Sequence, residues 1–375
     1  MTLTSGLGGQ LSIDLGALAR NWRALDKVSA GALTGAVVKA DAYGTGIAVA
    51  SKALHAAGAR FFFAATPDEA MAVRAAVPDA HIFVLNGLYP GAANLYVRQN
   101  LMPIISSVAM LEEWLAKCLE RNEAYPSAFH FDTGMNRLGF RLNEAAQVRD
   151  RIQALGYTPQ MVMSHLACAD QPNHEKNRTQ LALFASVMNQ FPGVPASLAN
   201  SAGLMTGRDY HFQMVRPGIA LYGGRAVNGR KNPMAPVVTL HVPILQVKEA
   251  RTGESVGYGA TQALSRDSRL AIISHGYADG FFRSLSGSNM RPGGKVAIRG
   301  KICPVIGRVS MDQVTIDITE LGPDIPNPGE GAEVLGNLVS VDDQADAGGT
   351  IGYEILTSLK GRYSRNYIGD GNLPE

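Results

Sequence analysis

The segment AVVKADAYGTG, residues 36–46, ends an apolar run on Lys39 and continues with Tyr43 and two glycines. Burial is expected at the end of such a run, and desolvating an unpaired ammonium is costly. A buried lysine escapes this cost through a charge partner, a depressed pKa or covalent use of its amine. The sequence therefore predicts one of these three roles for Lys39.

Lys39 belongs to a regular alternation of short apolar runs and longer segments of helical period, which extends over roughly the first 225 residues. The strand-length runs are GAVVKA, RFFFAAT, HIFVLNG, LMPIIS, SAFHFD, MVMSHL, PASLAN and GIALYG. A helix start is marked by Thr66, Pro67 and Glu69, which fit an N-cap, a first-turn proline and a capping-box glutamate. About eight such units predict an α/β fold with an N-terminal (β/α)8 TIM-type barrel.

The pattern changes after GGRAVNGRKNP, a polar, glycine-rich stretch that is typical of a linker. From there on, short runs rich in Val and Ile are broken by glycines, which predicts a mainly antiparallel β domain at the C-terminal end. We expect the barrel at residues 1–228 and the β domain at 229–375, and the first ~8 residues could pack with the β domain instead.

Barrel chemistry lies at the C-terminal ends of the strands, and polar residues gather there in this chain. Lys39, Asp132, His165, Asn200 and Ser201 each follow a predicted strand. The loops after the seventh and eighth strands, ANSAGLM and RPGIALYG, are where such barrels often hold a phosphate. An amine on the first strand and an anion cradle on the last two are what pyridoxal phosphate requires.

The residues also resemble a known family. The segments AVVKADAYGTG, DTGMNRLGF, SHLACAD, NSAG, VRPGIALYG, SVGYGATQ, GYADGFFR, GRVSMDQ and GYEIL look like the successive motifs of the alanine racemases. The resemblance extends over nearly the whole chain and both predicted domains. It implies a fold-type III pyridoxal 5'-phosphate enzyme, an isomerase that interconverts L-alanine and D-alanine.

The resemblance assigns proton transfer to two bases on opposite faces of the substrate carbon. Lys39 would hold the cofactor through its amine and act as one base, and Tyr258 would be the other. Tyr258 would be hydrogen-bonded to His165, and His165 to Arg216. In this family the tyrosine comes from the second subunit, which implies a homodimer with shared active sites.

Arg216 bears on the type of reaction, because it would face the pyridine nitrogen of the cofactor. An arginine only donates hydrogen bonds and keeps its proton, so this nitrogen should stay unprotonated. The cofactor is then a weaker electron sink, which favours return of a proton to the same carbon over transamination.

The remaining site residues bind the substrate and the cofactor or line the entrance. Arg137 and the backbone N–H of Met311 would anchor the carboxylate of the substrate, since an arginine offers a planar fork to a carboxylate. Tyr43, Ser201, Gly218, Ile219 and Tyr353 would bind the phosphate. Tyr277, Tyr353 and Asp170 would line a narrow entrance that favours a side chain no larger than methyl.

Several positions depart from the family pattern. Where members often carry a carbamylated lysine that positions the carboxylate-binding arginine, this chain has His130. His130 could orient Arg137 as an imidazole donor or as a cation, or a bound anion could replace the carbamate. Thr45, Asn136 and Ser310 also differ from common residues, but none of them is a proton-transfer group.

Composition limits the class of protein. The formal net charge is only +2 among 375 residues, and no basic stripe suggests a nucleic-acid partner. No apolar run is long enough to span a membrane, and nothing at the N-terminus resembles a signal peptide. The three cysteines, Cys118, Cys168 and Cys303, are widely spaced, which argues against a metal site or disulfides and favours the cytoplasm.

Other functions are also consistent with these sequence features. A racemase of broader amino-acid specificity could use the same scaffold, because discrimination depends on a few entrance side chains. A decarboxylase of the same architecture would be expected to present a carboxylate to the pyridine nitrogen, where this chain has Arg216. A cofactor-binding homeostasis protein would resemble the barrel alone. The D-alanine formed could supply peptidoglycan synthesis, or the enzyme could serve alanine catabolism.

Overall fold

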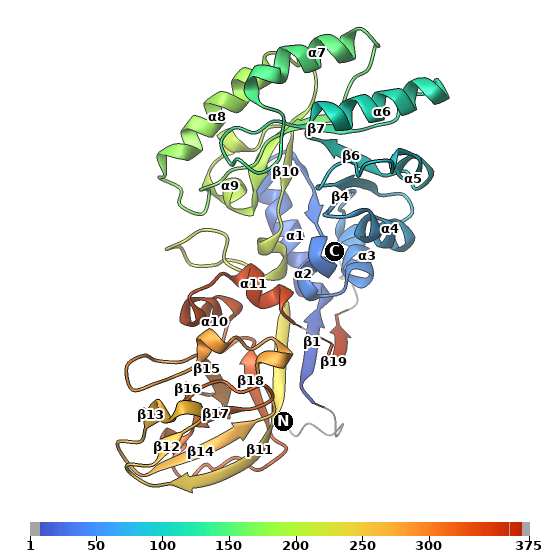
Figure 1. Ribbon diagram of the computed structural model, residues 1–375. Coiled ribbons are helices and arrows are strands. Elements are labelled where there is room, and N and C mark those ends of the chain that lie inside the picture. Colours follow the sequence, from blue (N-terminus) through green and yellow to red (C-terminus); the bar gives the residue numbers. More distant parts are fainter. Residues whose placement is uncertain (1–7, 360, 370–375) are drawn as a thin grey trace. The chain divides into compact units, whose positions relative to one another are not determined.

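The computed structural model describes residues 8–359 and 361–369 (Figure 1). Contacts divide them into a barrel unit, Leu18–Leu221 with Arg225–Met234, and a β unit, which holds residues 8–17, Tyr222–Gly224 and the stretch from Ala235 onward. The expectation for the first ~8 residues falls, except for Gly8, outside the described residues.

Parallel strands form the closed sheet of the barrel unit. The strands are β2 (Leu33–Thr34), β3 (Ala36–Val37), β4 (Phe61–Ala64), β5 (His81–Val84), β6 (Met102–Ile105), β7 (Ala128–His130), β8 (Met161–Met163), β9 (Ala196–Asn200) and β10 (Met214–Arg216). β2 and β3 are two parts of one extended run, interrupted at Gly35. Because β2 pairs with β10 and β3 pairs with β4, this run closes the barrel. The predicted (β/α)8 barrel is confirmed.

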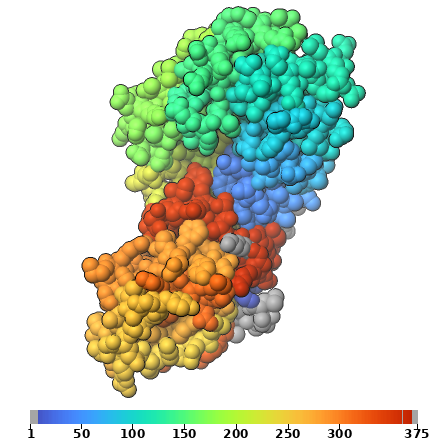
Figure 2. All heavy atoms as spheres, in the orientation of Figure 1, coloured from blue at the N-terminus to red at the C-terminus, as the bar shows by residue number. Residues whose placement is uncertain are grey.

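Helices follow the strands around the barrel. They are α1 (Leu15–Ser29), α2 (Lys39–Gly44), α3 (Ile47–Ala57), α4 (Pro67–Ala76), α5 (Ala93–Arg98), α6 (Val108–Arg121), α7 (Ala145–Gln153), α8 (Glu175–Met188) and α9 (Ser201–Thr206). Segments of α6 to α8, coloured cyan to green, cover the face of the barrel unit that Figure 2 shows. The predicted start of α4 is confirmed, since Thr66 caps it by accepting from the Glu69 N–H and Pro67 follows.

The eighth predicted strand was wrong. GIALYG does not form a strand; its residues Ile219–Tyr222 form a 3-10 helix, and the eighth barrel strand is β10, Met214–Arg216. All four residues of this 3-10 helix are buried. A short, wholly apolar run satisfies the burial pattern of a strand and of a helical turn equally well.

The β unit contains an eight-stranded, mainly antiparallel sheet, as predicted. Its strands are β1 (Gln10–Asp14), β11 (Val238–Ala250), β14 (Ser268–Ile273), β15 (Lys295–Ile298), β16 (Lys301–Ile306), β17 (Val314–Asp317), β18 (Gly331–Leu335) and β19 (Ser364–Ile368). A separate hairpin joins β12 (Ser255–Val256) to β13 (Gln262–Ala263). The unit also holds two short helices that the sequence patterns did not predict, α10 (Val341–Gly348) and α11 (Gly352–Thr357).

Across the described residues, no helix combines the length and the apolar character that crossing a membrane would require.

Candidate active site

Lys39 stands just after β3, at the start of an unusual turn. The next four residues, Ala40 to Tyr43, all have backbone angles of the left-handed helix, with φ of 53–54°. For residues other than glycine this costs about 1–2 kcal/mol each, so surrounding contacts must hold the turn. The Ala40 N–H donates to Glu69 Oε1 at 2.7 Å, and the Ile47 N–H donates to Asp41 Oδ1 at 2.8 Å.

The pKa of the Lys39 ammonium is lowered. Burial is the main cause, the positive charge of Arg137 adds to it, and the negative charge of Glu69 opposes it. Of the three roles that the sequence predicted for Lys39, a depressed pKa is therefore the one that this half-buried lysine shows. It makes the neutral amine, the form that can act as nucleophile or base, more accessible near pH 7.

Ser201, Gly218 and Tyr43 come together as a cradle of hydrogen-bonding groups. The Gly218 N–H donates to Ser201 Oγ at 2.8 Å and the Ala220 N–H donates to the same oxygen at 3.4 Å. The Tyr43 hydroxyl lies so close to Gly218 that a Cβ added there would be 2.3 Å from it. Two hydroxyls beside backbone N–H groups, with no side chain at Gly218, are a donor set that fits a phosphate. Ile219, also predicted for this site, follows Gly218 directly.

Arg216 ends β10 and is buried without a carboxylate among its hydrogen-bond partners. Nη1 donates to Ser197 Oγ, and Nη2 donates to the Ser164 carbonyl at 2.6 Å and the Leu198 carbonyl at 3.4 Å. Burial lowers the pKa of Arg216 to about 9, so the guanidinium is still charged at pH 7. These bonds use three of the five N–H groups of the guanidinium, so Nε–H and one N–H of Nη1 are left as donors to the ring nitrogen of a cofactor, and the residues present fit pyridoxal phosphate.

His165 follows β8 and is neutral at pH 7. Its pKa lies well below the usual range, mainly because it is desolvated and further because of the charge of Arg216. The hydrogen bonds of Arg216 go to Ser197, Ser164 and Leu198 instead of His165, so the predicted His165–Arg216 bond is not formed among the described residues. The two side chains interact electrostatically.

A surface cavity of about 680 Å³ adjoins the loop after β7. Asp132 and Arg137 line it, together with Arg141 and neighbouring loop residues. Asp132 Oδ1 accepts from the N–H groups of Gly134 and Met135 at 2.8 Å, which shapes the loop that carries Arg137. The predicted carboxylate anchor therefore faces a space that is open to solutes.

Asp170, predicted at the entrance, is held by a residue that the sequence patterns did not single out. The backbone N–H of Asn228 donates to the Asp170 carbonyl at 2.8 Å, and Asn228 Nδ2 donates to Asp170 Oδ2 at 2.7 Å. Asn228 belongs to the polar stretch interpreted as a linker. A polar composition is common to linkers and to loops that are hydrogen-bonded to the barrel, so the sequence did not indicate this contact.

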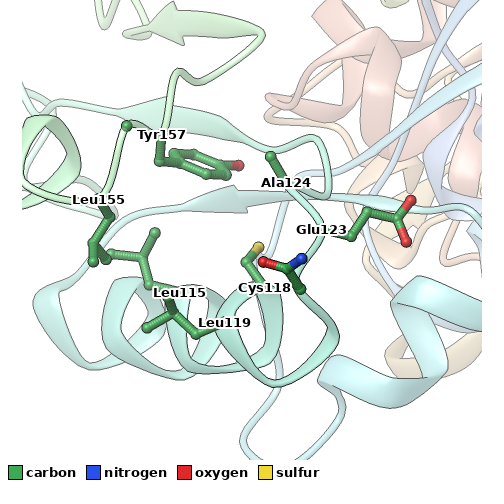
Figure 3. Close-up of a pocket in the computed structure, with 9 residues that line it drawn as sticks. Leu115, Cys118, Leu119, Glu123, Ala124, Leu155 and Tyr157 are labelled. Carbon is green, nitrogen blue, oxygen red and sulfur yellow. The ribbon is translucent and has the colours of Figure 1, made fainter.

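A smaller cavity of about 190 Å³ lies between the end of α6 and residues 155–157 (Figure 3). Leu115, Cys118, Leu119 and Tyr157 are among its lining residues, and none of the predicted site residues is. Burial raises the pKa of the Cys118 thiol, which makes this thiol less reactive. The cavity carries none of the proposed chemistry.

In the β unit, the predicted site residues are exposed, with Tyr353 on α11, Tyr258 and Tyr277 on short 3-10 helices and Met311 on a loop. Tyr258 is 68 % exposed and Met311 52 %, and Tyr277 and Tyr353 are also exposed. The Tyr277 N–H donates to the Ser310 carbonyl at 3.1 Å, so the segments that carry Tyr277 and Met311 lie side by side. This degree of exposure is unusual for aromatic and thioether side chains that stay in water.

Comparisons with known proteins agree with this geometry. The family model for the alanine racemase N-terminal domain matches residues 13–226, and the model for the C-terminal domain matches 237–367. The chain belongs to the alanine racemase family.

Named relatives and a solved structure show how close the similarity is. An alanine racemase of Rhizobium meliloti is 48 % identical over 96 % of this chain and 97 % of its own length. A biosynthetic alanine racemase of Agrobacterium fabrum is 47 % identical over 96 % of this chain and 93 % of its own. The crystal structure of alanine racemase from Bartonella henselae, with covalently bound pyridoxal phosphate, has a TM-score of 0.90 and 35 % identity, covering 96 % of this chain and 99 % of that one. The predicted family, fold class and cofactor are confirmed.

His130, the departure from the alanine racemase pattern, is buried at the end of β7. Burial lowers its pKa to about 4, and the positive charges of Arg216 and Arg137 add to this while Asp132 opposes it. His130 is therefore neutral at pH 7, which removes the cation among the alternatives for how Arg137 is oriented. An imidazole donor and a bound anion stay open.

Sequence reasoning missed two kinds of residue in this alanine racemase fold. Glu69 was recognised only as a capping residue, but its carboxylate also accepts from the Ala40 and Ala65 N–H groups and so braces the turn after Lys39. Asn177 and Gln180 were not singled out, although they are buried amides on the inner face of α8. The available signal was a polar residue at an apolar position of the helical period.

Proposed function

We propose that this protein interconverts L-alanine and D-alanine with pyridoxal phosphate bound at the barrel mouth. The main support is the convergence of three features at that mouth, in a chain of the alanine racemase family. These are the half-buried amine of Lys39, the cradle at Gly218, and Arg216, whose buried charge meets only neutral oxygens.

Lys39 carries the cofactor and exchanges one proton in this proposal. When bound, pyridoxal phosphate supplies an electron sink that makes the Cα–H of the substrate acidic. Because the pKa of Lys39 is lowered, its Nζ can accept the α-proton of one alanine enantiomer and return a proton to the same carbon. Tyr43, Ser201, Gly218 and Ile219 hold the phosphate, and Tyr353 joins them from α11.

Arg216 limits transamination, the side reaction that competes with racemisation. Its guanidinium would donate one of its remaining N–H groups to the ring nitrogen and keep the proton, since its pKa of about 9 keeps it charged at pH 7. A protonated ring nitrogen would spread the negative charge into the ring and favour protonation away from Cα. Arg216 therefore directs the proton back to the carbon that lost it.

Tyr258 of the partner subunit is the second base, which exchanges the α-proton of the other enantiomer on the opposite face. The exposure of Tyr258, Tyr277 and Met311 supports docking of the β unit onto a second copy of this chain. His165 orients the tyrosine hydroxyl as a neutral imidazole. The active sites of the homodimer are then shared.

The substrate is anchored by its carboxylate and selected by size. Arg137 and the Met311 N–H bind the carboxylate, while Tyr277, Tyr353 and Asp170 narrow the entrance to a methyl side chain. We place the reaction in the cytoplasm, because Cys118, Cys168 and Cys303 are all free thiols. The D-alanine formed serves peptidoglycan synthesis, or the same equilibrium feeds alanine catabolism.

Two measurements test this function. The optical activity of L-alanine should decay to zero with the purified holoenzyme, whereas loss with L-serine or L-lysine but not L-alanine would favour a racemase of different specificity. Co-expression of Lys39→Ala with Tyr258→Ala should restore about a quarter of wild-type activity, because hybrid dimers contain one intact shared site. Sites built within one chain would regain no activity, which would refute the sharing.

A further inference from the structure

The loop from His165 to Gln171 lacks helix and strand, yet it carries two predicted site residues, His165 at its start and Asp170 near its end. Some of its backbone groups bond to other backbone groups, as the Gln171 N–H does to the Cys168 carbonyl at 3.0 Å, and others depend on side chains for hydrogen bonds. The neighbouring helix α8 supplies them from two amides one turn apart, Asn177 and Gln180, which are 1 % and 0 % exposed.

Gln180 spans the start of this loop. Its Nε2 donates to the His165 carbonyl at 2.9 Å and to Thr133 Oγ1 at 3.1 Å, and its Oε1 accepts from the Ala167 N–H at 2.8 Å. The Gln180 side chain is thus hydrogen-bonded to the backbone on both sides of Leu166. A fully buried amide with three hydrogen bonds holds one geometry, because each lost bond would leave a buried polar group unpaired.

Asn177 holds the far end of the same loop. Its Nδ2 donates to the Cys168 carbonyl at 3.1 Å and to the Gln171 carbonyl at 3.0 Å. The residues between these two carbonyls include Asp170. The two amides of α8 therefore fix the loop at both ends.

The same contacts lead to Arg216. Thr133 Oγ1, which accepts from Gln180, is 2.8 Å from Ser164 Oγ, and the Ser164 carbonyl accepts from Arg216 Nη2 at 2.6 Å. Thr133 and Ser164 are themselves buried. One network of buried polar groups thus joins Gln180 to the backbone of His165 and to the guanidinium of Arg216.

We propose that Gln180 is a positioning residue for proton transfer, which holds His165 at the place where it orients Tyr258 of the partner subunit. This inference rests on the proposed function. Gln180 touches neither substrate nor cofactor and acts through the backbone of His165. Apolar packing alone would place an apolar residue here, as α8 does one turn later with Phe184.

The direction of the kinetic effect distinguishes positioning from loss of stability. A displaced His165 slows only the proton transfer made by Tyr258. In Gln180→Met, the Cα-deuterium isotope effect on kcat/KM should therefore rise for the alanine enantiomer whose deuteron Tyr258 removes and fall for the enantiomer whose deuteron Lys39 removes, so the two effects should change in opposite directions. We expect kcat/KM itself to fall about 10- to 100-fold, as for a misplacement on the order of 1 Å.

Phe184→Leu is the matched control, because Phe184 is buried on the same face of α8 and contacts Phe212 instead of the loop. It should lower the melting temperature while leaving the ratio of the two isotope effects at the wild-type value. Thr133→Val, which removes the hydroxyl that bonds both Gln180 and Ser164, should change the ratio in the same direction as Gln180→Met but less.

Hydrogen–deuterium exchange in the cofactor-free protein gives a readout independent of activity. The Ala167 amide should lose protection in Gln180→Met and keep it in Phe184→Leu. Equal isotope-effect ratios in wild type, Gln180→Met and Thr133→Val, or unchanged protection of Ala167, would overturn the positioning role while leaving the racemase intact. If the wild-type holoenzyme does not racemise alanine, the proposed function itself is wrong.

Discussion

Gly218→Ala should weaken cofactor binding through its phosphate alone. The added Cβ would lie 2.3 Å from the Tyr43 hydroxyl oxygen and 3.1 Å from Tyr43 Cζ, whereas ordinary contact begins at 3.4 Å. The hydroxyl must therefore retreat by about 1 Å, away from the place where the phosphate would meet it. The next nearest atom, Val37 Cβ, lies at 3.5 Å from the added Cβ, which is ordinary contact.

The size of the effect follows from the bond that is lost. A hydrogen bond to a charged group contributes about 1.5–3 kcal/mol. Since 1.4 kcal/mol is a factor of ten in Kd, the Kd of the cofactor should rise about 10- to 100-fold. Overpacking against Tyr43 should also cost about 1–3 kcal/mol of stability, visible as a lower melting temperature.

The assay should isolate non-covalent binding. On a Lys39→Ala background, which cannot bond the cofactor covalently, titration with pyridoxal phosphate and with phosphate-free pyridoxal reports the contribution of the cradle. Gly207→Ala is the matched control, because Gly207 follows α9 directly, its φ of 168° is extended backbone and a Cβ there meets nothing within 4 Å. The control should bind both compounds like its parent.

The affinity for pyridoxal distinguishes loss of the phosphate contact from a general distortion of the site. Gly218→Ala should bind pyridoxal as its parent does, because pyridoxal carries no phosphate. An equal loss of affinity for both compounds would refute the phosphate cradle and indicate a general distortion of the barrel mouth. Unchanged affinity for pyridoxal phosphate would show that the Tyr43 hydroxyl does not bind it.

Two further predictions concern buried charge. His130→Asn should reduce acid sensitivity: the folded-state pKa of about 4 lies below the ordinary 6.5, so the unfolded chain binds the proton first and stability is lost as pH falls between these values. In the wild type, this loss of stability is about 2 kcal/mol at pH 5. Thermal unfolding of the cofactor-free wild type and variant at pH 7 and pH 5 measures it. A stability difference between the two pH values that is the same in both proteins would contradict the assignment. Arg216→Glu should raise transamination relative to racemisation, because a carboxyl group can keep the ring nitrogen protonated. Pyruvate formed per alanine racemised measures this ratio, and a wild-type value would speak against the role of Arg216.

Local signals in the sequence were sufficient for much of the fold. The alternation of apolar runs and helical periods predicted the barrel, because burial on both faces of a parallel sheet leaves continuous apolar strands. Thr66, Pro67 and Glu69 predicted the start of α4, because a helix N-terminus is stabilised by neighbours in the chain. The position of Lys39 at a strand end, together with family resemblance, was enough to indicate the cofactor.

Other features were decided only by contacts between distant segments. GIALYG was mistaken for a strand because burial alone does not separate a strand from a helical turn, and pairing with β9 and β2 made Met214–Arg216 the eighth strand instead. The pKa of His130 is lowered mainly by burial and further by the charge of Arg216, which is far along the chain.

By itself, then, the sequence determined most strands of the barrel, the mainly antiparallel character of the β unit, the family and the cofactor. Only the tertiary structure decided what holds the site residues: Glu69 on the left-handed turn after Lys39, Asn228 on Asp170 and Gln180 on His165. The physical reason is that hydrophobic periodicity reports how deeply a residue is buried. It carries no information on which distant polar group a buried amide or carboxylate will meet.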